Sequence, residues 1–196
     1  MNATLDHAAG VEAGRNAPTV RVWDPLVRLF HWSLAACILG AFLVEEGDTA
    51  HQWLGYTALA LVAVRVAWGF VGTRHARFSD WVRGPRAVAG YLRERAAGTS
   101  RRRLGHNPAA AVMILLLLAG TVAIGVTGWM QTLDAYWGAE WLEELHEALA
   151  YGLLAFIGVH VAAALVESVH YGENLVAAMV HGRKRALDSD GGLPPG

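Results

Sequence analysis

The chain has 196 residues, of which 54% are hydrophobic, and its formal net charge is −1. Soluble domains are usually about 45–50% apolar, and the excess here is concentrated in a few long runs, which indicates a membrane protein. The single cysteine, Cys37, excludes a disulfide within the chain, the absence of C-x-x-C-H excludes covalent haem attachment, and the lack of further thiolates disfavours an iron–sulfur cluster.

Residues 1–20 and 186–196 are predicted to form mobile tails around one membrane domain, residues 21–185. Asp24-Pro25 and Asn107-Pro108 supply an N-cap and a first-turn proline, which are typical of helix starts. A cleaved signal peptide is disfavoured, because an acidic stretch follows the first apolar run. Each run is long enough to cross roughly 30 Å of hydrocarbon as a helix. The sequence therefore predicts an all-α bundle of four transmembrane helices, at about 26–44, 53–72, 109–130 and 147–169.

Charge is divided between the connecting segments. Lys and Arg gather before the first run, between the second and third, and after the fourth, whereas the other two connections contain acids and no Lys or Arg. The positive-inside rule therefore predicts that both termini and the long basic loop face the cytoplasm. We interpret the basic loop as a contact for anionic lipid rather than a nucleic-acid site. Residues 86–95 are expected to form a short interfacial helix.

Four of the nine histidines lie in or at the ends of the predicted spans, where polar side chains are costly: His31, His51, His146 and His160. His146 and His160 are fourteen residues apart, so they project within about 40° of one helix face and roughly 21 Å apart along the axis. Because successive helices alternate in direction, His31 lies at the level of His160, and His51 at the level of His146.

Two histidine pairs at two depths fit the axial ligands of two haems, because the iron needs imidazoles on both sides, held by facing helices. Any one of these histidines alone is more simply an interhelical hydrogen-bond partner. Zinc or copper is a competing ligand. Two separate two-histidine sites without a nearby cysteine suit haem better.

Other residues agree with two haems. Arg65 lies on the histidine face of the second helix, and an arginine in lipid needs an anion such as a haem propionate. Arg28, one turn before the first histidine, is placed to do the same. Gly55 and Gly158 would let a helix backbone approach a flat ligand closely.

Several further residues have more than one interpretation. His170 and Glu167 lie near the inner edge, and we keep a role for His170 beside a quinone or propionate, and for Glu167 in a proton relay, as alternatives. Glu147 is interpreted as a carboxylate near a helix N-terminus rather than a partner of the adjacent histidine. The glycines of the third helix are interpreted as sites of close packing: Gly120, Gly125 and Gly128.

Several segments together are specific, although each alone is a weak signal: Val22-Trp23-Asp24-Pro25, Arg28-Leu29-Phe30-His31-Trp32, Gly105-His106-Asn107-Pro108, His146-Glu147, Gly158-Val159-His160, Glu173-Asn174-Leu175 and Gly182-Arg183-Lys184-Arg185. Over residues 21–185 the chain resembles the bacterial cytochrome b561 family, which includes b-type cytochrome subunits of nickel–iron hydrogenases. The resemblance implies a four-helix bundle with two b haems in a bacterial inner membrane. Carried over, His31 and His160 would hold the cytoplasmic-side haem iron, and His51 and His146 the periplasmic-side one.

The predicted function is transmembrane electron transfer, as a subunit rather than a stand-alone catalyst. Electrons would pass between quinone or quinol and a periplasmic redox protein, either a c-type cytochrome or a hydrogenase small subunit. The acidic outer loops would steer a basic partner. Direct reduction of superoxide is a variant of this electron-transfer hypothesis. Assembly into a homodimer is left open. The competing hypothesis is a non-redox membrane scaffold or transporter whose histidines relay protons or bind a metal.

Overall fold

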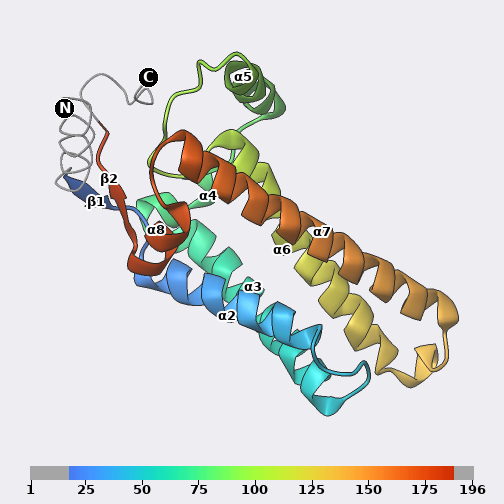
Figure 1. Cartoon of the computed structure of the whole chain (residues 1–196). Coiled ribbons are helices and arrows are strands. Elements are labelled where there is room, and N and C mark those ends of the chain that lie inside the picture. The colour runs from blue at the N-terminus through green and yellow to red at the C-terminus, as the bar shows by residue number, and fades with distance from the viewer. Residues whose placement is uncertain (1–17, 188–196) are drawn as a thin grey trace, which may run out of the picture.

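The computed structural model describes residues 18–187, so most of the two predicted tails lies outside the described residues. The chain is mostly helical (Figure 1), and four long helices dominate it: α2 (Pro25–Ala41), α3 (Thr49–Val71), α6 (Pro108–Gln131) and α7 (Glu140–His170). The shorter elements are β1 (Thr19–Arg21), η1 (Arg74–Ala76), α4 (Phe78–Trp81), α5 (Pro85–Ala96), η2 (Asp134–Tyr136), α8 (Leu175–His181) and β2 (Arg183–Arg185).

Two of the long helices begin as their sequence predicts. The Asp24 carboxylate accepts a hydrogen bond from the Val27 backbone N–H at 2.9 Å, and Pro25 is the first residue of α2. The Asn107 side chain accepts one from the Ala110 N–H at 2.7 Å, and a proline again opens α6. Each cap satisfies a donor that the first helical turn leaves free.

Helix α7 begins at Glu140, about two turns before the predicted start at residue 147. Glu140 and Glu143 lie in its first turn, where the helix dipole favours carboxylates. Leu142 is 0% exposed, so this turn also packs against the molecule. As a result, His146 lies inside the helix rather than at its end.

Three helices are long and apolar enough to cross a membrane, namely α3, α6 and α7. The fourth, α2, is apolar but has 17 residues, and at about 1.5 Å per residue it is shorter than a typical hydrocarbon core of ~30 Å. Its span across the bilayer stays a prediction. Many large apolar side chains on these helices are exposed, as expected where lipid replaces water. The chain is therefore a multi-pass membrane protein.

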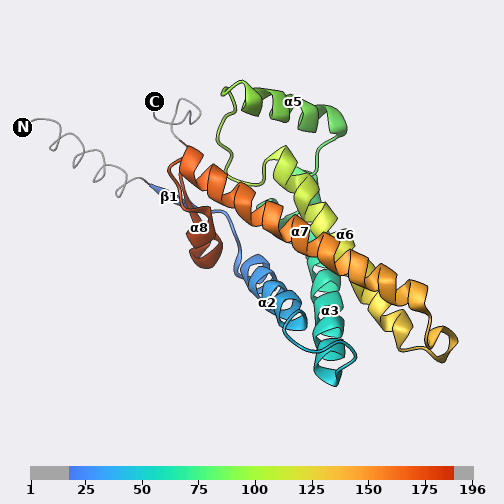
Figure 2. The same cartoon turned by 45° about the vertical axis from the view of Figure 1, so that its right-hand side comes forward.

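The long helices pack in chain order, α2 on α3, α3 on α6 and α6 on α7 (Figures 1 and 2). A Cβ atom at Gly125 of α6 would lie 2.5 Å from Leu59 Cγ of α3, and one at Gly120 would lie 3.2 Å from Leu153 Cδ1 of α7. These two glycines therefore allow close packing, as predicted. Over the described residues, α7 makes only sparse contact with α2 and α3.

One end of the bundle carries a cap, which we define as residues 18–24, 73–107 and 171–187. Strands β1 and β2 pair antiparallel there, with Val20 opposite Lys184, so the two described ends of the chain lie side by side (Figure 1). The sequence did not predict this sheet, because three-residue strands are too short for an alternating pattern to be recognised. The helix predicted at residues 86–95 is present as α5, and its place at the membrane interface stays a prediction.

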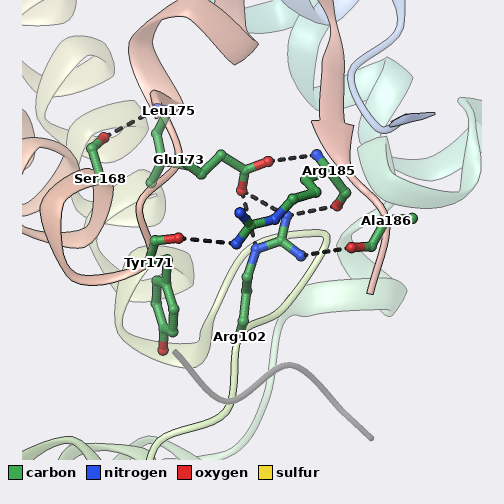
Figure 3. Close-up of polar contacts among 7 residues, drawn as sticks. All are labelled: Arg102, Ser168, Tyr171, Glu173, Leu175, Arg185 and Ala186. Atoms are coloured by element: carbon green, nitrogen blue, oxygen red, sulfur yellow. Dashed lines mark hydrogen bonds and ion pairs between the residues drawn. The ribbon is translucent and has the colours of Figure 1, made fainter. Parts of the chain in front are cut away.

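Arg102 ties the loop before α6 to the C-terminal part of the cap (Figure 3). Its Nη2 donates to Glu173 Oε2 at 2.7 Å and to the Arg185 carbonyl at 2.6 Å, while Nη1 donates to the Ala186 carbonyl at 3.3 Å. Glu173 Oε1 accepts the Arg185 backbone N–H at 2.6 Å, and Arg185 Nη2 reaches the Tyr171 carbonyl at 3.2 Å. The network holds three separate chain segments together.

We expect the cap to lose stability in mild acid through His106. Its ring lies 4.5 Å from Trp23 and 5.3 Å from Trp81 between ring centroids. Burial lowers the pKa of His106 from 6.5 to about 3. Below pH 6.5 the unfolded chain therefore gains a proton on His106 while the folded chain keeps this ring neutral. The contribution of neutral His106 to the free energy of unfolding is full above pH 6.5 and is lost as the pH falls toward 3.

The melting temperature of the purified protein, followed from pH 7 down to about 4.5, measures this effect. In His106→Gln the acid-side slope should flatten, because glutamine has no proton to gain. His181→Gln is the control, because His181 is exposed. Equal slopes in the wild type and His106→Gln would contradict the expectation.

Candidate functional site

The four histidines singled out by the sequence meet in two pairs. His31 of α2 faces His160 of α7, and the ring centroids are 6.3 Å apart with an interplanar angle of 51°. His51 of α3 faces His146 of α7, also at 6.3 Å, with an angle of 64°. We call His31 and His160 the cap-side pair, and His51 and His146 the far pair. Helix α7 thus contributes one ring to each pair.

The separation of the rings fits a metal ion between them. With a metal–nitrogen bond of about 2.0–2.1 Å and a nitrogen roughly 1.1 Å from its ring centre, two imidazoles on opposite sides of one ion have centroids roughly 6.2–6.4 Å apart. Both pairs lie at 6.3 Å. A direct hydrogen bond or ring stacking does not require this spacing twice.

The donor set favours haem over a bare metal ion. Among residues 18–187, no group of three or more His, Cys, Asp or Glu side chains is placed to hold a metal. A zinc site normally needs three or four protein ligands. Haem brings its four equatorial nitrogens with it, so two axial imidazoles complete its iron.

Hydrogen bonds orient both rings of the far pair. His51 Nδ1 lies 3.1 Å from the Ala41 carbonyl oxygen. His146 Nδ1 lies 2.9 Å from the Thr127 hydroxyl oxygen. A histidine that ligates a metal through one nitrogen usually donates its other N–H to such an acceptor. In both rings this leaves Nε2 free to bind a metal.

Several buried donors toward the cap end of the bundle, one of them in the cap-side pair, have no acceptor within residues 18–187. His31 Nδ1, Arg28 Nε, Arg65 Nη1 and Trp81 Nε1 are buried and have no hydrogen-bond partner among the described residues. Arg65 is only 3% exposed, and its Nη2 donates to the Ala76 carbonyl at 3.0 Å. Its guanidinium also lies over the rings of Phe78 and Trp81. Buried cationic donors of this kind suit an anionic group.

Open space lies beside the two predicted glycines. A Cβ atom at Gly55 of α3 or at Gly158 of α7 would meet nothing within 4 Å. These glycines therefore do not serve helix packing, unlike Gly125. Together with the sparse contact of α7 with α2 and α3, they are compatible with a flat ligand between the helices.

The other three candidates also lie in α7, and Glu167 and His170 are near the cap. Glu167 forms an ion pair with Arg95 at 2.9 Å, which accounts for it without a proton relay. The ring of His170 packs against Tyr171 at 4.6 Å, and its Nε2 is buried without a partner within the described chain. Glu147 is exposed.

Sequence reasoning missed Thr127 at the far pair and did not identify what Gly128 packs against. Thr127 of α6 is hydrogen-bonded to His146. A Cβ atom added at the neighbouring Gly128 would lie only 3.0 Å from Cε1 of the same ring. Gly128 carried a packing signal, and the structure shows that it packs against a candidate ligand. Thr127 carried no signal, because a threonine in a helix usually bonds its own backbone.

Comparison with known proteins places the chain in a family. A family model described as prokaryotic cytochrome b561 matches residues 22–182. Proteins named probable Ni/Fe-hydrogenase B-type cytochrome subunit are similar over almost their whole length. The protein of Azotobacter vinelandii is 24% identical over 96% of this chain and 98% of its own length.

Two further relatives with the same printed name agree. The protein of Rhodobacter capsulatus is 25% identical over 91% of this chain and 86% of its own length. That of Cupriavidus necator is 26% identical, with 95% and 96% covered. No solved structure is significantly similar to this chain. The chain therefore belongs to the prokaryotic cytochrome b561 family, that is, to the haem b cytochromes that transfer electrons in membranes.

Proposed function

We propose that the chain holds two haem b groups and transfers electrons across the membrane between the quinone pool and a periplasmic redox partner. One haem would lie between His31 and His160, and the other between His51 and His146. The observation that supports this most strongly is the repeated 6.3 Å separation of opposed imidazole rings at two points along α7.

The spacing along α7 suits electron transfer. The two histidines of this helix are fourteen residues apart, which is roughly 21 Å along the axis. When bound, each haem would supply a one-electron couple, and two axial imidazoles would leave its iron without an open position for oxygen or substrate. The protein would hold the two sites at opposite depths of the bilayer.

Arg65 and Arg28 would bind the propionates of the cap-side haem. Their unpartnered buried nitrogens, Nη1 and Nε, support this role. Gly55 and Gly158 would leave room for the porphyrin planes. A carboxylate at Arg65 would also compensate its charge, which the carbonyl of Ala76 alone does only in part.

The proposed orientation puts the cap in the cytoplasm, with four membrane-spanning helices and both termini inside. The cap carries the arginine-rich loop, and the opposite end carries acids without Lys or Arg. That acidic end would face the periplasm beside the far pair and steer a basic partner. The names of the relatives support a hydrogenase small subunit, with a c-type cytochrome as the alternative.

The haem-to-protein ratio of the purified chain tests this proposal. We expect two non-covalent haems per polypeptide and, after reduction, the sharp absorption bands of low-spin bis-histidine iron. All of the haem should be extractable with acidified acetone, because the chain has no cysteine motif for covalent attachment. A stable preparation with one haem, or with none, would refute the two-site proposal.

A further inference from the structure

Thr127 places a buried hydroxyl against the far pair. The residue is 7% exposed and lies in α6, which packs on α7. Its Oγ1 lies 3.0 Å from the Ile124 carbonyl and 3.1 Å from the Ala123 carbonyl, as well as 2.9 Å from His146 Nδ1. Three polar neighbours therefore share one hydroxyl group.

A single hydroxyl proton limits how these three contacts can be satisfied. A hydroxyl has one proton and two lone pairs, and a backbone carbonyl only accepts. A Thr127 proton donated to the carbonyl of Ala123 or Ile124 in its own helix leaves the hydroxyl oxygen as an acceptor toward His146. In that arrangement Nδ1 of His146 is the donor and carries the proton. The Nε2 lone pair is then available for a metal.

The opposite ring of the far pair is fixed in the same way. Ala41 offers His51 a carbonyl oxygen, which only accepts, so Nδ1 of His51 is also protonated. The cap-side pair differs, because Nδ1 of His31 is buried without a partner among the described residues. Both sites thus offer two histidines, but within the described chain hydrogen bonds to Nδ1 orient both rings of the far pair and not His31 of the cap-side pair.

Helix α6 also limits the movement of the His146 ring. A Cβ atom at position 128 would lie 3.0 Å from Cε1 of this ring and 3.5 Å from Nδ1. Gly128 therefore lets the ring approach the α6 backbone closely enough for the Thr127 oxygen to reach Nδ1. The adjacent residues together set the position and the tautomer of His146.

We propose that Thr127 is a positioning residue for the far haem, holding His146 as the Nε2-ligating tautomer and lowering the reduction potential of that haem relative to one without this bond. The inference rests on the proposed function. Its physical basis is that an acceptor on Nδ1–H makes the imidazole a stronger donor, and a stronger donor stabilises ferric iron more than ferrous iron.

The test is a redox titration of Thr127→Val in the full chain, followed by the haem absorption bands. Valine keeps the shape of the side chain and removes the acceptor. Outer partners of metal ligands typically change affinity by about 10–100-fold, and a tenfold change in the ferric-to-ferrous preference is 59 mV for a one-electron couple. We expect the wave of the far haem to move to higher potential by about this amount, while the other wave stays in place.

Two variants separate this effect from general damage to α6. Thr127→Ser keeps the hydroxyl and should titrate like the wild type. Thr121→Val makes the same change in the same helix at a buried threonine that bonds only the Leu117 carbonyl, at 2.8 Å, and both waves should keep their potentials. The shifted wave is assigned by repeating the titration in His160→Ala, which should keep only the far haem.

Selective loss of the far haem in Thr127→Val, with Thr121→Val intact, would also support the inference, because it shows that the ligand needs this acceptor. Two haems with unchanged potentials in Thr127→Val, or a shift of the cap-side wave alone, would overturn the inference and leave the two-haem proposal standing. A wild-type chain without two haems would instead overturn the proposed function.

Discussion

Replacing His160 with alanine is expected to halve the haem content of the purified protein, from two haems per chain to one. The change removes one ring of the cap-side pair and leaves His31 without an opposed partner at 6.3 Å. The far pair is roughly 21 Å away along α7, and its rings are hydrogen-bonded to Ala41 at the end of α2 and to Thr127 of α6 rather than to His160. The remaining haem should keep its bis-histidine absorption bands.

His146→Ala should give the reciprocal result, with loss of the far haem and retention of the cap-side haem. His170→Ala is the matched control, because it removes a histidine from the same helix whose ring packs against Tyr171. That variant should keep both haems. Circular dichroism should show unchanged helix content in all three variants. Loss of neither haem in His160→Ala, or of both from a folded chain, would contradict the pairing.

Much of this arrangement follows from the sequence, for identifiable reasons. The fixed rise and rotation of a helix determine that residues fourteen apart, such as His146 and His160, share a face at two depths. Alternating helix directions then select the ring that each one meets. Asp24-Pro25 and Asn107-Pro108 determine where α2 and α6 begin, because capping depends on neighbours within the same turn. Local geometry carries this information.

Features that depend on contacts between distant segments were not predictable. The hydroxyls of Thr121 and Thr127 look alike in the sequence, yet only Thr127 meets a ring from α7. The pairing of β1 with β2 joins the two ends of the described chain through three residues each. Arg65 was predicted from its face and depth, but its bond to the Ala76 carbonyl depends on how the loop after α3 folds back. Tertiary structure alone determines these contacts.

Arg102→Ala is expected to destabilise the cap strongly, because it removes one partner of a buried ion pair. The side chains of Arg102 and Glu173 are only 5% and 11% exposed, and their nearest atoms are 2.7 Å apart. Breaking a buried ion pair from one side typically costs about 3–5 kcal/mol, because the remaining charge stays buried without its partner. Glu173 would keep one hydrogen bond, from the Arg185 backbone N–H, so we expect the lower end of this range.

The melting temperature of the purified chain measures this cost. For a chain of this size, 1 kcal/mol corresponds to about 2–4 °C, so Arg102→Ala should melt at least about 6 °C lower. Arg95→Ala is the matched control, because it breaks the second Arg–Glu pair of the cap, whose side chains are 27% and 17% exposed. More exposed pairs contribute roughly 0–1 kcal/mol, so that variant should melt within a few degrees of the wild type. Equal losses in the two variants would mean that burial does not distinguish the pairs, and a loss of only a few degrees in Arg102→Ala would mean that its network does not hold the cap segments together.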